Sequence, residues 1–311
     1  SRGLGDVYKR QDIAKAVGCT QPDRTQLLAC LRSTPLVDPV NSEKGLLKAG
    51  ERATQGKTLT FSPSIGASGA NPRSMADAIA QGKVFKVPLL MGGARDELRL
   101  YMGYDQQSGD PITAANYADR LLKYYRTAQA TPLGQRILTR YPLKDPNRAP
   151  ETLGSVISHY NPQVGINNCL YLHTATQLVR RSGLPLYSFE FADPKALVLG
   201  VGIAATPDPK MEFGAVHSSA LNDLFPHLSN TSRIDGPDLL AESQPLATQM
   251  QQMVASFATR GVPSAAGLPA WPVFTKGRSV MRLMPGQSAI YDAGAHHDCS
   301  FWRELFPKEL S

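Results

Sequence analysis

The sequence predicts an α/β fold, in which helices flank a sheet, from two observations. Short apolar segments alternate along the chain with longer segments whose apolar residues recur at helical spacing. The 311 residues are 42% hydrophobic and 19% charged, which supplies a large core and excludes a disordered chain. Few sheet strands precede a closing hairpin, so we expect a sheet whose first strands lie outside this sequence.

The first part of the chain is predicted to hold two helices and one buried strand. Thr25–Arg32 carries leucines on one face and ends before a proline. Residues 33–62 are predicted to be irregular up to the strand-like Leu59–Phe61. Pro72–Gln81 starts with proline and is followed by glycine, as helices often are. Val84–Met91 is a short apolar run and predicts a buried strand.

The remainder is predicted to be mainly helical, with one strand and a hairpin. Helical spacing, or a proline at the start, predicts seven helices: Ala114–Tyr125, Pro132–Thr139, Pro150–Tyr160, Gly165–Ser182, Ala220–Phe225, Pro245–Thr259 and Cys299–Phe306. Leu186–Phe191 alternates and is rich in aromatic residues, which predicts a strand before a loop over residues 192–213. Ser279–Leu283 and Gln287–Ile290 are predicted to form a hairpin.

The charge and hydropathy of the chain exclude two classes of protein. The net charge of +7 comes from scattered residues, whereas a nucleic-acid-binding protein gathers its basic residues on one face. We therefore expect no nucleic-acid partner. No segment approaches the roughly 20 apolar residues that a membrane span needs.

The first residues look foreign to the fold. SRGLGDVYKR resembles the translated read-through of a sequencing adapter, and no initiator Met or apolar signal core accompanies it. We expect residues 1–11 to be such a scar and residues 12–311 to be the back part of a longer protein. The alternative is a natural basic tail.

Four cysteines, Cys19, Cys30, Cys169 and Cys299, leave two interpretations open. They allow two disulfides in three possible connectivities, or four buried free thiols. None of them forms a C-x-x-C pair, which disfavours zinc and thioredoxin-like sites.

One candidate for catalytic chemistry is the segment from Leu89 to Glu97. A predicted strand ends, Gly92 and Gly93 are predicted to turn the chain, and two carboxylates, Asp96 and Glu97, follow. Ligand and catalytic sites of α/β proteins lie at the carboxyl ends of the strands. The alternative is a helix start, where acidic residues stabilise the helix dipole.

The second candidate is His217, which follows a long loop and precedes a short helix. A histidine in this position can turn its imidazole into a cleft, although a solvated or capping histidine would look the same. Residues 296–298 read His-His-Asp, which suggests a metal site, but adjacent side chains in a loop rarely share one metal.

A set of ordered motifs extends these candidates along the chain: Gly18-Cys19…Leu27-Leu-Ala-Cys30-Leu-Arg32, Val87-Pro-Leu-Leu-Met-Gly92…Arg95-Asp-Glu97, Leu186-Tyr-Ser-Phe-Glu-Phe191, Gly214-Ala-Val-His217, Phe257-Ala…Gly261-Val-Pro263…Leu268-Pro-Ala-Trp-Pro272 and Cys299-Ser-Phe-Trp302. With these motifs, from residue 12 to residue 311, the chain resembles type B carboxylesterases, the group that includes the cholinesterases. Acid before histidine is also the order of the last two triad residues in α/β-hydrolases.

The resemblance implies a fold and an activity. It implies the C-terminal part of an α/β-hydrolase sheet flanked by helices, with a helical cap over residues 100–160. Glu97 matches the triad acid and His217 the triad histidine of a serine esterase. It also implies an ester substrate and no cofactor.

The resemblance further implies the disulfides Cys19–Cys30 and Cys169–Cys299, and with them a secreted or periplasmic parent protein. Tyr101, Tyr104 and Tyr117 are expected to line the cap, with ordinary packing as the alternative. Ala220 departs from the family, in which many members carry an acidic residue soon after the histidine.

The family's nucleophile and oxyanion segment are expected upstream of Cys19, outside this chain. The nearest local match to G-x-S-x-G is Gly66-Ala-Ser68-Gly-Ala70, which lacks the last glycine and a proper strand before it. We therefore predict that the chain alone has no esterase activity. Two alternatives stay open: a complete chain that uses Ser68 as nucleophile, and a non-catalytic esterase-like module used for adhesion.

Overall fold

A computed structural model describes residues 11–41, 44–54, 73–107, 109–198, 211–228, 238–275 and 279–310. The chain divides into two compact units, residues 1–75 and residues 76–311. Ser68 and the strand-like Leu59–Phe61 lie outside the described residues.

The first unit is helical and carries one disulfide. Helix α2 (Arg24–Ser33) begins where the Asp23 side chain accepts a hydrogen bond from the amide of Gln26 at 2.9 Å, and Cys19 is bonded to Cys30. Helix α3 (Leu46–Thr54) lies where residues 33–62 were predicted to be irregular, so that prediction is wrong there. Its first two amides bond to the carbonyls of Pro35 and Leu36 at 3.1 and 3.0 Å, a tertiary contact that no local pattern reveals.

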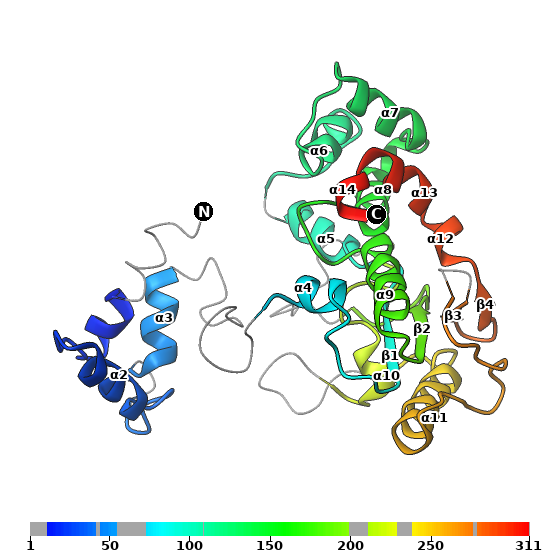
Figure 1. Ribbon diagram of the computed structural model, residues 1–311. Helices are drawn as coiled ribbons and strands as arrows, with labels where there is room; N and C mark the ends of the chain where they lie inside the picture. Colours follow the sequence, from blue (N-terminus) through cyan, green and yellow to red (C-terminus); the bar gives the residue numbers. More distant parts are fainter. Residues whose placement is uncertain are drawn as a thin grey trace. The chain divides into compact units, whose positions relative to one another are not determined.

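The second unit is built on a four-stranded sheet in the order β1-β2-β3-β4 (Figure 1). Strand β1 is Leu89–Ala94, β2 is Leu186–Phe191, β3 is Val280–Leu283 and β4 is Ala289–Tyr291. The first three run parallel, and β4 returns antiparallel to β3 as the predicted hairpin. The carboxyl ends of β1, β2 and β3 therefore lie at one edge of the sheet, which confirms the predicted mixed α/β class.

Strand β1 corrects the prediction made for residues 84–93. The strand begins at Leu89 and runs through Ala94, so Gly92 and Gly93 do not turn the chain. Both glycines serve close packing instead. A Cβ on Gly92 would lie 2.5 Å from the Phe189 carbonyl oxygen, and one on Gly93 would lie 2.3 Å from the Tyr171 ring. The turn follows after the end of β1, at residues 95–98.

Helices cover the sheet and form a helical layer beyond it (Figure 1). Their bounds are α4 (Met75–Ala80), α5 (Arg99–Gln107), α6 (Tyr117–Lys123), α7 (Pro132–Arg140), η1 (Pro146–Arg148), α8 (Ala149–His159), α9 (Asn168–Ser182), α10 (Leu221–Leu224), α11 (Gln244–Arg260), α12 (Ala293–His296), α13 (Cys299–Leu305) and α14 (Pro307–Leu310). Helix α9 packs on β1 and β2, α5 and α6 pack on α8, and α10 packs on α11.

The predicted helices are found close to their expected bounds, and their ends follow local rules. Gly183 ends α9 at φ +66° and Gly261 ends α11 at φ +71°, the left-handed conformation that glycine adopts readily. Helices α5, α12 and α14 were not predicted. Residues 100–160 do hold helices α5 to α8, whereas their role as a cap stays a prediction.

The C-terminal helices are anchored by an aromatic core and by a disulfide. Trp302 is fully buried and stacks on Tyr125 and Tyr141, with ring centroids 5.0 and 5.4 Å away. Cys169 on α9 is bonded to Cys299 on α13 across 130 positions of sequence. No helix in the described ranges combines the length and apolar character needed to cross a bilayer.

Candidate active site

Two loops meet at the carboxyl edge of the sheet, and main-chain hydrogen bonds join them. The acid loop, residues 95–98, follows β1 and carries Glu97. The histidine loop, residues 214–219, carries His217. The amide of Asp96 donates to the carbonyl of Ala215 at 2.8 Å, and the amide of His217 donates to the carbonyl of Glu97 at 3.1 Å. The two loops are thus fixed to each other before any side chain takes part.

The side chains of Glu97 and His217 lie within hydrogen-bonding distance. Glu97 Oε2 is 2.8 Å from His217 Nδ1. The Glu97 side chain is only 6% exposed, whereas that of His217 is 38% exposed. The other carboxylate oxygen, Oε1, accepts from the amide of Ala94 at 2.9 Å and from the Tyr171 hydroxyl at 3.4 Å. Glu97 is held at both oxygens, and the imidazole reaches toward solvent.

This geometry fixes the imidazole for proton transfer. A carboxylate accepts hydrogen bonds, so Nδ1 carries the ring proton and donates a hydrogen bond to Glu97 Oε2. In the neutral ring Nε2 is then an acceptor, and none of the described residues bonds to it. The hydrogen bond to Glu97 raises the pKa of His217 against the opposing effect of burial. A partly exposed imidazole with a free acceptor nitrogen is suited to act as a general base.

Asp96, the neighbouring carboxylate, is engaged elsewhere. It lies 3.2 Å from Arg95 Nε and 3.2 Å from a terminal nitrogen of Arg99. Its Oδ2 also accepts from the amide of Ala215 at 3.2 Å. Gly214 has φ +67°, and a Cβ there would lie 2.5 Å from Asp96 Oδ2. Asp96 therefore shapes the histidine loop, while Glu97 alone of the two contacts the imidazole.

The three tyrosines expected near the site have different surroundings. The Tyr101 ring lies 6.2 Å from the His217 ring and is 38% exposed. Tyr104 is 6.3 Å from Tyr101 and packs against the helical core. Tyr117 is buried in that core and donates to the carbonyl of Tyr141 at 3.1 Å. Tyr101 alone of the three borders His217.

A second acid–imidazole pair is buried in the second unit, and its acid, Glu190, is in register with Gly93 of β1. Glu190 on β2 bonds to His297 Nε2 and to the Tyr291 hydroxyl, and the side chains of Glu190 and His297 are 4% and 0% exposed. Burial alone would raise the pKa of Glu190, but His297, Tyr291 and His296 together outweigh burial and lower that pKa. His297 of the His-His-Asp segment is thus part of a buried, hydrogen-bonded acid–imidazole pair. No group of three or more metal-ligand side chains in the described ranges is arranged to hold a metal.

Glu190→Gln is expected to destabilise the second unit by about 3 kcal/mol, because it removes the buried carboxylate to which His297 and Tyr291 are hydrogen-bonded. Urea unfolding at neutral pH measures the effect. The matched control is Glu304→Gln, which breaks the exposed Arg136–Glu304 pair, 2.5 Å long, and should cost less than about 1 kcal/mol. Equal losses in the two variants would contradict the prediction.

The sequence did not point to several residues that surround Glu97. Asn168, Ser158 and Tyr171 come from α8 and α9, between 60 and 74 positions from the acid loop residues that they contact. The pair Asn167-Asn168 at the start of an apolar helix signals a cap, and Asn167 does cap α9 by accepting from the amide of Leu170 at 3.0 Å. No local signal indicates that Asn168 reaches back to the acid loop.

Comparison with known proteins gives one consistent result. A sequence model described as "Carboxylesterase family" matches residues 5–302. A cholinesterase from Mus musculus is 23% identical, with 96% of this chain and 47% of the relative covered. A cocaine esterase from Homo sapiens is 23% identical, with 96% and 49% covered. Carboxylesterase 3 from Pongo abelii is 22% identical, with 96% and 50% covered. The chain spans about half the length of the curated relatives it matches.

Proposed function

The chain belongs to the carboxylesterase family, and we propose that it supplies the acid and the base of a serine carboxylic-ester hydrolase. In this proposal Glu97 is the acid, His217 is the base, and the serine and oxyanion hole come from sequence upstream of the chain. The observation that carries the proposal is the 2.8 Å bond between Glu97 Oε2 and His217 Nδ1, with Nε2 left for a substrate-side partner.

The proposed reaction proceeds through an acyl-enzyme. His217 Nε2 takes the proton of the serine hydroxyl as its oxygen attacks the ester carbonyl, and Glu97 stabilises the resulting imidazolium. The imidazolium returns that proton to the leaving alcohol when the C–O bond breaks. A water molecule then attacks the acyl group and gives a proton to Nε2. The imidazolium passes this proton to the serine oxygen as the bond between that oxygen and the acyl carbon breaks, which releases the acid and restores the free enzyme. Backbone amides hold the oxyanion, and the loss of one such donor typically costs 10²–10³ in rate.

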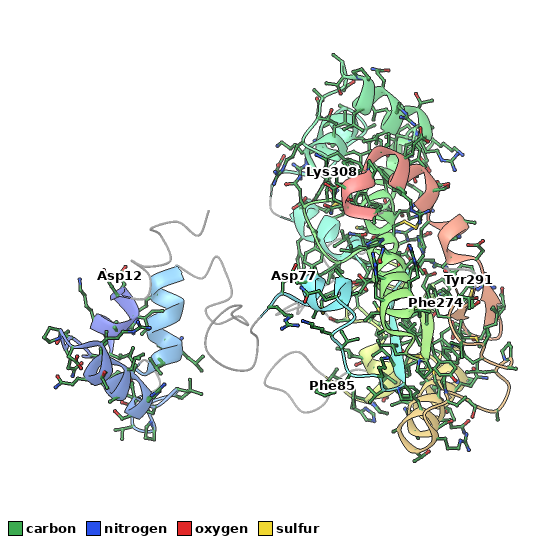
Figure 2. The ribbon with its side chains drawn as sticks, viewed as in Figure 1. Asp12, Asp77, Phe85, Phe274, Tyr291 and Lys308 are labelled. Atoms are coloured by element: carbon green, nitrogen blue, oxygen red, sulfur yellow. A yellow bond between two sulfur atoms is a disulfide. The ribbon has the colours of Figure 1, made fainter. Side chains whose placement is uncertain are left out.

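The position of β1 in the sheet supports an upstream source for the serine. Among the described strands β1 pairs only with β2, so none of them covers its other edge. A parallel strand there would end at the same edge as Glu97 and His217, and a serine following it would lie at that edge. Phe85, which is 90% exposed, projects from the periphery near the start of β1 (Figure 2). Val87 is 58% exposed, which gives an added segment apolar surface to cover.

The surroundings of the pair suit a carboxylic ester with an apolar or aromatic group. The aromatic ring of Tyr101 borders His217 at 6.2 Å.

The two disulfides, Cys19–Cys30 and Cys169–Cys299, indicate an oxidising compartment. We therefore place the parent protein outside the cell or in the periplasm.

Expression of the full-length parent beside this chain tests the proposal, with a short-acyl nitrophenyl ester as substrate. We expect turnover by the parent, its loss in His217→Ala, and no turnover by the chain alone. If the chain alone turns over the ester and Ser68→Ala abolishes this turnover, Ser68 is the nucleophile instead. An inactive, correctly folded parent would favour a non-catalytic module and overturn the proposal.

A further inference from the structure

Side chains from α8 and α9 hold the backbone of the acid loop. The amide nitrogen of Asn168, Nδ2, lies 3.1 Å from the carbonyl oxygen of Arg95 and 3.4 Å from that of Ala94. The amide of Leu98, at the other end of the loop, donates to Ser158 Oγ at 2.9 Å. Both ends of the loop that carries Glu97 are therefore bonded to side chains from distant segments.

The two clamping side chains are buried, and each forms a further hydrogen bond to the backbone of α8. Asn168 is 5% exposed and Ser158 is 0% exposed. Asn168 Nδ2 also donates to the carbonyl of Ser158 at 3.2 Å, and Ser158 Oγ donates to the carbonyl of Gly154 at 2.7 Å. Hydrogen bonds between buried polar groups favour one arrangement, because each lost bond leaves an unsatisfied group.

The same turn of α9 reaches the carboxylate itself. Tyr171, three residues after Asn168, donates its hydroxyl to Glu97 Oε1 at 3.4 Å. Its ring fills the space that a side chain on Gly93 would need. One turn of α9 thus contacts the backbone that precedes Glu97, Gly93 of β1 and the Oε1 atom of Glu97.

We propose that Asn168 is a positioning residue for the Glu97–His217 pair, which acts by fixing the backbone of the acid loop. Asn168 touches neither imidazole nor carboxylate, so its effect is transmitted through the carbonyls of Ala94 and Arg95. Without its amide these carbonyls lose a buried donor, the loop loosens, and Glu97 Oε2 leaves Nδ1 for part of the time. The catalytic meaning of this role rests on the proposed function.

The test is an NMR titration of the His217 imidazole in the isolated, isotope-labelled chain from about pH 4 to about pH 9. The signal is assigned by its absence in His217→Ala. In Asn168→Leu, which keeps the side-chain size, the pKa of His217 should fall by about 0.5 or more as the bond to Glu97 weakens. An unchanged value in Asn168→Leu, where Glu97→Gln does lower it, would overturn the proposal.

Asn167→Leu is the matched control. Asn167 is the adjacent asparagine, is fully buried and donates to the carbonyls of Asn161 and Val164 at 3.2 and 2.9 Å. Its loss should lower stability and leave the pKa of His217 unchanged. An equal fall of that pKa in Asn167→Leu would reduce Asn168 to a structural residue and also overturn the proposal.

Ser158→Ala covers the case in which Asn168→Leu does not fold. It removes the acceptor of the Leu98 amide and the donor to the carbonyl of Gly154. The pKa of His217 should fall as in Asn168→Leu, whereas an unchanged pKa would count against the clamp. This titration needs no ester turnover. An inactive parent therefore refutes the proposed function alone, and an unmoved pKa refutes the positioning role alone.

Discussion

Glu97→Gln in the full-length parent is expected to lower kcat by about 10⁴-fold, the loss found when a triad acid becomes an amide. A glutamine amide can donate a hydrogen bond to Nδ1, which stabilises the tautomer with the proton on Nε2. That tautomer cannot accept the serine proton. The measurement is kcat at saturating ester, with circular dichroism to show that the fold is kept.

Asp96→Asn is the matched control for this prediction. It makes the same chemical change in the adjacent residue, and asparagine can still accept from the amide of Ala215. Its kcat should stay within about tenfold of the parent's, because Asp96 does not contact the imidazole. A loss of kcat in Asp96→Asn as large as that in Glu97→Gln would contradict the assignment of Glu97, rather than Asp96, as the triad acid.

Glu97→Gln should also change how the stability of the fold depends on pH. Glu97 raises the pKa of His217 above its unfolded value. This raised pKa contributes stability that is fully present below the unfolded pKa and is lost as the pH rises through the folded pKa. The gap in unfolding free energy between the unsubstituted chain and Glu97→Gln should therefore be wider at about pH 5.5 than at about pH 8. Urea unfolding at both values measures it, and a gap that widens toward pH 8 would contradict the assignment.

Loss of the disulfide Cys169–Cys299 is expected to destabilise the second unit by about 5 kcal/mol in the loop-entropy account. The bond closes a loop of 130 positions, and the unfolded chain regains that freedom when the bond is absent. Cys169→Ser with Cys299→Ser, followed by urea unfolding of the purified chain, measures the effect.

The second disulfide supplies the comparison. Cys19–Cys30 spans only 11 positions, so its removal should cost about 3 kcal/mol and affect the first unit. Two transitions recorded by hydrogen exchange would separate the units. Equal losses for both disulfides would show that native-state contacts, rather than loop length, set their contribution.

Local rules predicted most helices because their signals are local. Proline starts α7, and glycines in the left-handed conformation end α9 and α11. The bounds of β1 were wrong because Gly92 and Gly93 look like a turn in sequence, whereas close approach of Phe189 and Tyr171 explains them. Helix α3 was missed because a tertiary contact satisfies its first amides.

The candidate site was predictable only in part, for a related reason. Glu97 and His217 were found from their order and from the resemblance to esterases, and the structure brings them to 2.8 Å. Asn168, Ser158 and Tyr171 were not found because their contacts with the acid loop depend on how α8 and α9 pack. An isolated asparagine at a helix start carries no information about a carbonyl more than 70 positions away.

The main-chain hydrogen bonds between residues 96–97 and 215–217 can preserve the geometry of the Glu97–His217 pair while the sequence around it changes. Every residue type except proline brings the same amide, and all bring the same carbonyl. Exchange of the side chain at Ala215, for example, leaves the acceptor of the Asp96 amide in place. Because these bonds do not depend on side chains, the residues around the site can change toward new substrates. The relative positions of the acid and the imidazole are kept.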